Sequence, residues 1–132
     1  MAMHFPAIIT LLSLLLFLVT VFAVGAARTK YGIKAPATTG NADFERIFRV
    51  QMNTLESLVL FLPVLWLFSI YVSLWWTGII GLMWILGRIF YAVGYARKAE
   101  GRTVGYGISL LAFAILAIGS AVGIVMRILA GL

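Results

Sequence analysis

The chain has 132 residues, of which 64% are hydrophobic and only 11% are charged, whereas soluble domains average about 45–50% apolar and about 25% charged residues. This composition excludes a soluble domain and predicts one integral membrane domain over residues 1–132, since that length leaves room for little besides the spans. The net charge of +6 does not indicate a nucleic-acid partner, because the basic residues flank apolar segments and are expected to set membrane topology. The absence of cysteine excludes disulfides, thiolate metal sites and a cysteine nucleophile.

Four apolar segments predict an all-α fold, an integral membrane four-helix bundle. Each approaches or exceeds the roughly 20 residues that a spanning helix needs, and a helix satisfies its own backbone groups in lipid. The expected spans cover about residues 5–27, 44–71, 74–97 and 104–127. The first is too long for the core of a signal peptide, about 7–15 residues, so we expect it to be retained.

The second span is expected to begin after a polar loop over residues 28–43. Asn41 and Asp43 are both candidates to cap this helix, and Glu45 in its first turn would favour the helix dipole. Pro63 predicts a local kink, because it removes one backbone hydrogen bond.

A polar stripe marks the start of this second span. At about 100° per residue, Arg46, Arg49, Asn53 and Glu56 share a stripe less than about 90° wide. Ionised and amide groups are costly near hydrocarbon, so the stripe predicts contacts among these groups or with a polar ligand. Two alternatives stay open: Arg46 is equally suited to reach lipid headgroups, and Glu56 to form a structural ion pair with Arg49 or Arg88.

The third span carries a matching stripe. Arg88, Tyr91 and Tyr95 lie on one face, and Arg102 joins them if the helix continues that far, whereas Arg97 lies nearly opposite. The alternative for the two tyrosines is an interfacial aromatic belt. The tryptophans are expected to be lipid anchors rather than a cofactor site; they are Trp66, Trp75, Trp76 and Trp84.

Charge counting predicts the topology. The basic residues gather around the first and third connections, and only Arg127 and the amino terminus lie on the opposite side. The positive-inside rule therefore places these two connections and the polar stripes towards the cytoplasm, with both termini on the other side. The short loops and the lack of a retention signal favour a bacterial inner membrane.

The polar stripes suit a zwitterionic ligand. Arginine offers a fork of donors to carboxylates, a glutamate accepts from an ammonium group, and an asparagine can bond a peptide unit in both senses. A tripeptide with two carboxylates and one amine fits this inventory. The residues by themselves indicate only a polar pocket with excess positive charge.

Residues 45–56, Glu-Arg-Ile-Phe-Arg-Val-Gln-Met-Asn-Thr-Leu-Glu, resemble the E-R-x-x-R-x-Q-x-N-x-x-E signature of the MAPEG family, membrane-associated proteins in eicosanoid and glutathione metabolism. Residues 88–97 resemble the family's third-helix R-x-x-Y-x-x-G-Y-x-R pattern, and Arg102 its downstream arginine. Arg28 and the Thr38-Thr39-Gly40 segment also match, so the resemblance covers nearly the whole chain. It implies a homotrimer that holds glutathione, as co-substrate and without a metal, between neighbouring subunits near the cytosolic face.

The resemblance also implies roles for single residues. The family's glutathione ligands fall on Arg28, Arg49, Gln51, Asn53, Glu56, Arg88, Tyr91 and Tyr95. Arg102 matches the arginine that stabilises the glutathione thiolate, which makes it the expected catalytic residue, because a fixed cation lowers the pKa of a nearby thiol. Gln51 points away from the Arg49 stripe, as expected if the site lies between protomers.

Two departures argue against a dedicated leukotriene synthase. Ser57 and Thr29 stand where the leukotriene-forming members have a tyrosine and a second arginine, and that arginine is thought to assist epoxide opening there. The expected function is therefore a broader membrane glutathione transferase. Its thiolate would attack apolar electrophiles that partition from membrane lipid, and glutathione-dependent reduction of lipid hydroperoxides is a further expected activity.

Two rival functions are weighed against this one. The first is a non-catalytic, MAPEG-like lipid-binding membrane protein; in that class the glutathione residues are degraded, whereas here they are largely present. The second is a small four-span drug exporter, which would carry an acidic residue inside its first span. Residues 5–27 contain none.

Overall fold

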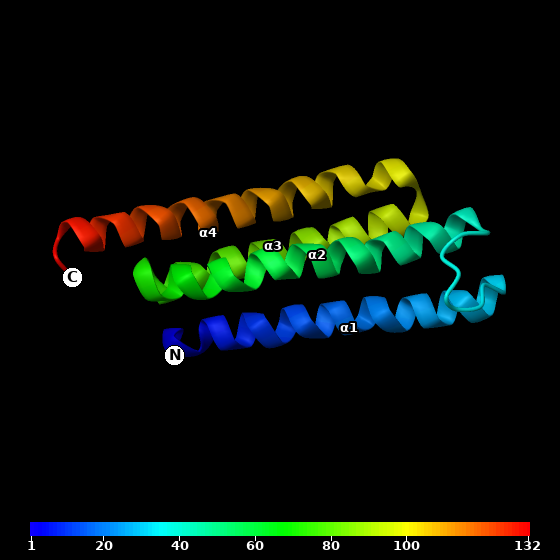
Figure 1. Cartoon of the computed structure of the whole chain (residues 1–132), viewed down its shortest axis with the longest axis horizontal. Coiled ribbons are helices and arrows are strands. Elements are labelled where there is room, and N and C mark those ends of the chain that lie inside the picture. The colour runs from blue at the N-terminus through cyan, green and yellow to red at the C-terminus, as the bar shows by residue number, and fades with distance from the viewer.

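Each of the four apolar segments forms one long helix in the computed structural model, which describes residues 1–132 (Figure 1). All four helices are long and apolar enough to cross a membrane. Short 3-10 turns precede the first and the last of them. The elements are η1 (Ala2–His4), α1 (Phe5–Tyr31), α2 (Ala42–Tyr71), α3 (Leu74–Arg97), η2 (Ala99–Arg102) and α4 (Thr103–Leu129).

The helix ends follow from local side-chain chemistry. Asn41, rather than Asp43, caps α2: its side-chain oxygen accepts a hydrogen bond from the Phe44 amide at 3.0 Å. Ser73 caps α3 in the same way, accepting from the Trp76 amide at 3.2 Å. Each cap satisfies one of the amides that a helix start leaves free. Because only residues 72 and 73 separate α2 from α3, these two helices form a tight antiparallel pair.

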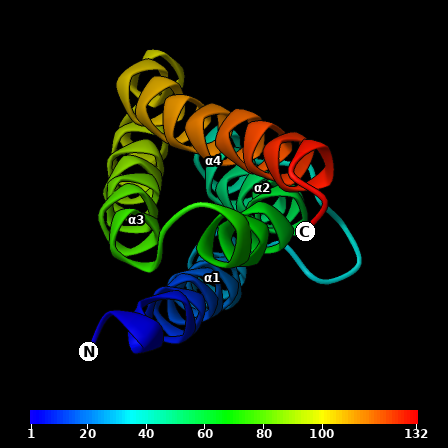
Figure 2. The same ribbon diagram turned by 90° about the vertical axis from the view of Figure 1, so that its left-hand side faces the viewer.

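The helix α2 lies at the centre of the bundle and packs against α1, α3 and α4 (Figure 2). Phe61 of α2 stacks on Trp84 of α3, with ring centroids 3.9 Å apart and ring planes 5° from parallel. Trp84 is only 1% exposed. The expectation of a lipid anchor is therefore wrong for this tryptophan, which is a core residue, whereas the other three are exposed to at least 42%.

Most of the remaining apolar surface faces outward. Only 27 of the 132 residues are buried, and large hydrophobic side chains are exposed along every long helix. An exposed apolar surface of this extent requires lipid or further protein around it. The bundle is thus suited to a membrane.

The helices α3 and α4 approach closely because glycines lie at their contact. A Cβ atom on Gly87 would lie 2.8 Å from the Ser109 amide nitrogen, and one on Gly105 would lie 2.5 Å from the Gly87 carbonyl oxygen. Both distances are shorter than packed carbon atoms tolerate. This contact sets the position of α4 along α3, and it brings the first turns of α4 against the polar stripe of α3.

Candidate functional site

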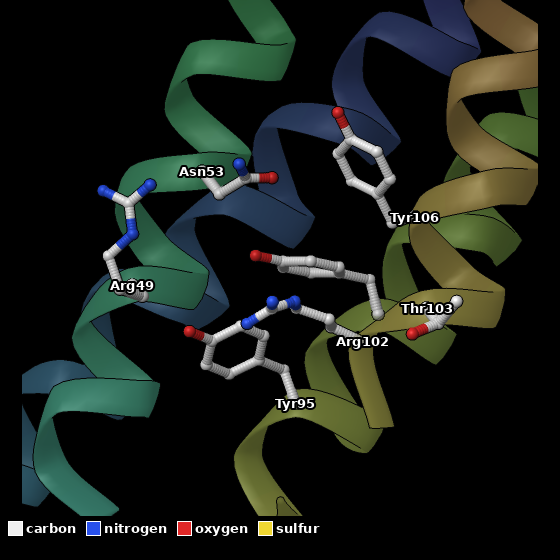
Figure 3. Close-up of a pocket in the computed structure, with 7 residues that line it drawn as sticks. Arg49, Asn53, Tyr95, Arg102, Thr103 and Tyr106 are labelled. Carbon is white, nitrogen blue, oxygen red and sulfur yellow. The ribbon is translucent and has the colours of Figure 1, made fainter. Parts of the chain in front are cut away.

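A cavity of about 300 Å³ opens between α2, α3 and the start of α4, beside the basic connections (Figure 3). We call it the polar pocket. Its lining residues come from these three helices and from η2: Arg49, Asn53, Tyr91, Tyr95, Arg102, Thr103 and Tyr106. Five of the nine residues expected at the site therefore lie together here, and Thr103 and Tyr106 join them.

Arg102 reaches the polar pocket by a route that differs from the helical extrapolation. The helix α3 ends at Arg97, and the chain then folds back through the 3-10 turn of η2. Gly101 of this turn packs directly on the backbone of Gly94, where neither residue has room for a side chain. As a result the Arg102 guanidinium lies over the Tyr95 ring, 5.5 Å from its centroid.

Arg88 lies beneath the polar pocket and is only 1% exposed. One guanidinium nitrogen donates to the Asn53 side-chain oxygen at 2.6 Å, and a second donates to the Ser109 hydroxyl at 3.3 Å. The same group lies 4.2 Å from the centroid of the Tyr91 ring. Neither ion pair of the chain involves Arg88, and its Nε atom has no partner. A buried charge is tolerated only when it is hydrogen-bonded, so Arg88 fixes the side chains around it.

Three residues of the polar stripe of α2, Arg46, Arg49 and Glu56, take part in two ion pairs. Arg46 pairs with Asp43, one turn earlier, so an acidic residue of its own helix is its partner. Arg49 lies 3.9 Å from Glu56, and both side chains are more than half exposed. Of the two partners considered for Glu56, the structure selects Arg49. Exposed pairs contribute little to stability, about 0–1 kcal/mol. A ligand can therefore replace the contact between Arg49 and Glu56 at a small cost in free energy.

Four of the eight expected ligands do not line the polar pocket of their own chain: Arg88, which lies beneath it, and Glu56, Gln51 and Arg28. Glu56 contacts Arg49 but does not line the cavity, and Gln51 is half-buried elsewhere on α2. Arg28 lies at the end of α1, where it donates to the Ala37 carbonyl at 2.7 Å and holds the first connection in place. Within one chain, the structure does not bring Arg28 or Gln51 to the other site residues.

The contribution of α4 to the site was not predicted from the sequence. Thr103 and Tyr106 line the polar pocket, and Ser109 bonds Arg88. These polar residues recur at intervals of three in an otherwise apolar helix, and that spacing places them on one face. The helical periodicity that identified the stripes of α2 and α3 would therefore also have identified this polar face of α4.

A second, smaller cavity of about 100 Å³ continues from the polar pocket between the same helices. We call it the inner recess. It is lined by Ser57, Leu60, Trp84, Arg88, Tyr106, Ser109, Leu110 and Phe113. Arg88 supplies its charge, and apolar side chains supply most of its wall. Tyr106 is the residue that lines both cavities. Elsewhere, no cluster of three or more His, Asp or Glu side chains is placed to hold a metal ion.

Comparison with known proteins adds a family relationship. The sequence model of the MAPEG family matches residues 6–122. An uncharacterized protein of the cyanobacterium Synechocystis is 52% identical, over 93% of this chain and 90% of that protein. Human microsomal glutathione S-transferase 2 is 40% identical, over 76% of this chain and 69% of its own. Rat leukotriene C4 synthase is 34% identical, over 95% and 83%.

Proposed function

The chain belongs to the MAPEG family, and from this premise we propose that it is a membrane-bound glutathione transferase that conjugates the glutathione thiol to apolar electrophiles. The observation that carries the proposal is the polar pocket, which gathers arginine, asparagine and tyrosine side chains at one end of an apolar bundle. The similarity to a microsomal glutathione S-transferase and to leukotriene C4 synthase supports the same chemistry. Reduction of lipid hydroperoxides stays a separate prediction.

The geometry of the pocket supports glutathione as the polar substrate. Arg49 is exposed and only loosely paired, so its guanidinium is available to a carboxylate in the forked geometry that arginine favours. Glu56 is then released to accept from the ammonium group. Asn53 is held by Arg88 at 2.6 Å, and its amide nitrogen remains free to donate to a peptide carbonyl. Tyr91 and Tyr95 supply hydroxyl groups along the α3 side of the pocket.

The proposed catalytic step uses Arg102. Its guanidinium lies over Tyr95 at the open end of the pocket, where a fixed cation favours the thiolate over the thiol. The thiol proton leaves to solvent, and the sulfur attacks the electrophilic carbon while the leaving group departs with its electron pair. The apolar electrophile arrives from the lipid side, so the pocket joins a water-soluble and a lipid-soluble substrate.

The positions of Arg28 and Gln51 support a homotrimer. Both residues match the glutathione ligands of the family, yet both lie outside the polar pocket of their own chain. We propose that they complete the pocket of a neighbouring subunit. A head-to-tail contact of this kind closes into a ring when the rotation permits, and it would cover part of the exposed apolar surface. Membrane lipid would cover the remainder.

The proposed location is a bacterial inner membrane, with the polar pocket towards the cytoplasm and both termini on the opposite side. The distribution of basic residues supports this orientation. The cyanobacterial relative supports a bacterial source. Glutathione would then reach the pocket from the cytoplasm.

Conjugation of a simple aryl chloride by purified protein in detergent tests the proposed function against non-catalytic lipid binding. With glutathione and chlorodinitrobenzene, the transferase should form the thioether well above the rate in protein-free detergent. A lipid-binding protein would add nothing to that background rate. Heat-unfolded protein at the same concentration is the control, and a rate equal to that control would contradict the proposal.

A further inference from the structure

Tyr106 occupies the boundary between the polar pocket and the inner recess, since it lines both cavities. On the recess side it is accompanied by apolar groups, among them Leu60, Leu110 and Phe113. On the pocket side its ring lies 6.4 Å from that of Tyr91. Figure 3 shows the Tyr106 ring rising from α4 with its hydroxyl on the side away from Arg102 and Thr103. A substrate that enters between the apolar groups therefore meets this hydroxyl, beside Arg88, on the side of the site away from Arg49 and Arg102.

The backbone of Tyr106 is held in place by contacts that do not involve its aromatic ring. The Ser109 hydroxyl donates to the Tyr106 carbonyl at 3.1 Å and accepts from Arg88, which in turn donates to Asn53. This chain of hydrogen bonds links α4 to α3 and α2. The preceding residue, Gly105, packs directly on the α3 backbone. Tyr106 is thereby held in register with the polar pocket.

The hydroxyl of Tyr106, by contrast, makes no hydrogen bond within the chain, and the side chain is 45% exposed. A buried tyrosine usually finds a hydrogen-bond partner for its hydroxyl, whereas Tyr106 is only partly buried. The hydroxyl of Tyr106 is therefore open to solvent and to a bound substrate. The backbone of Tyr106 is anchored, and its hydroxyl is free to donate.

We propose that Tyr106 is a catalytic acid for electrophiles whose carbon–oxygen bond breaks during conjugation, namely apolar epoxides. This proposal rests on the proposed transferase function. The thiolate attacks one epoxide carbon, so that a C–S bond forms and the C–O bond breaks. The oxygen retains that electron pair and takes the proton of the Tyr106 hydroxyl, which gives a hydroxy thioether. The phenolate then regains a proton from water at the open end of the pocket. An aryl chloride needs no such proton, because chloride leaves as a stable anion.

The test compares two electrophiles in one variant, Tyr106→Phe, which keeps the ring and removes only the unbonded hydroxyl. With glutathione and styrene oxide, the rate should fall by about 100-fold, the lower end of the contribution usual for general acid catalysis. With glutathione and chlorodinitrobenzene, the rate should fall far less, so that the ratio of the styrene oxide rate to the chlorodinitrobenzene rate drops sharply. Tyr71→Phe is the matched control, because Tyr71 lies under Arg127 at the opposite end of the bundle; it should leave both rates unchanged.

The outcomes separate this proposal from the function on which it rests. An unchanged rate with styrene oxide would overturn the role of Tyr106, and an equal fall with both electrophiles would also overturn it, because the hydroxyl would then serve both reactions alike. In either case the transferase function would stand. If the unmodified protein conjugates neither electrophile, the transferase function itself is wrong and the role of Tyr106 falls with it.

Discussion

Arg88 shows how a single side chain organises the site. It is almost completely buried, it has no acidic partner, and it donates to Asn53 and Ser109 on the two neighbouring helices. The inward orientation of the Arg88 side chain could be predicted, because Arg88 shares a helical stripe with Tyr91 and Tyr95. Its two partners could not, because helical phase says nothing about which residue of another helix lies opposite. Ser109 in particular lies in the fourth span, for which no polar stripe was predicted.

The first prediction concerns this pair of hydrogen bonds. Arg88→Lys should lower the free energy of unfolding by about 1.5–3 kcal/mol, the usual contribution of a hydrogen bond to a charged group, because a single ammonium cannot reproduce the planar fork of donors. Chemical denaturation in detergent measures the change. Arg97→Lys is the control, since Arg97 is exposed and the substitution there should change nothing. Equal stability of the two variants would show that the fork is dispensable.

The second prediction concerns Arg102. Under the proposed function, Arg102→Ala should lower the conjugation rate at neutral pH by about tenfold or more while glutathione affinity changes little. The reason is that the cation favours the thiolate, and an opposite charge typically lowers a pKa by about 1–3. Without the cation the thiol has its ordinary pKa, so raising the pH should restore much of the rate. A rate deficit that is independent of pH, or no deficit at all, would contradict this role; Arg97→Ala is the matched control.

At the level of the elements, the sequence predicted the four helices well, and the connection after α3 poorly. Apolar length and capping residues identify the helices, because lipid leaves the backbone few alternatives. Residues 98–101 contain no signal that ends a helix sharply, apart from Gly101. The fold-back of η2 depends on the contact between Gly94 and Gly101, which exists only once the chain has turned. The expected span 74–97 ends where α3 ends. Arg102 reaches the stripe side of α3 by this fold-back, and not by the continued helix on which its place in the stripe was conditional.

The third prediction uses the glycines of α4. Gly105→Ala should destabilise the bundle by about 1–3 kcal/mol, the usual cost of overpacking, because the added Cβ would collide with the α3 backbone. Gly107→Ala is an internal control in the same helix, two residues away. A Cβ there meets nothing within 4 Å, and alanine is the better helix former by about 0.5–1 kcal/mol. Opposite signs in thermal unfolding are expected; similar effects would argue against the close contact of α3 and α4.

At the level of the whole molecule, the polar pocket of one chain does not gather all the residues that the family resemblance assigns to glutathione. Arg28 and Gln51 lie apart from the polar pocket, and the apolar surface of the bundle is extensive. Both facts agree with the expectation that the site is shared between subunits, but neither follows from the hydropathy of a single chain. Assembly is the part of the account that a periodic pattern cannot predict, because symmetry contacts leave no period of their own in the sequence.

The fourth prediction tests this sharing by complementation. Arg28→Ala and Arg102→Ala should each be impaired when purified alone. When the two variants are co-expressed and purified as mixed trimers through two different tags, some pockets combine the intact Arg102 of one subunit with the intact Arg28 of the next, so activity should reappear. If both residues act within one chain, the mixed trimers should be no more active than the separate variants, and the shared pocket would be wrong.

The central claim is that this apolar helical bundle binds glutathione as a thiolate. Titration of the purified, folded protein with glutathione in detergent, followed by thiolate absorbance and calorimetry, tests it most directly. The account predicts saturable binding accompanied by proton release, and a loss of the thiolate signal in Arg102→Ala. Folded protein that takes up no glutathione would contradict the account.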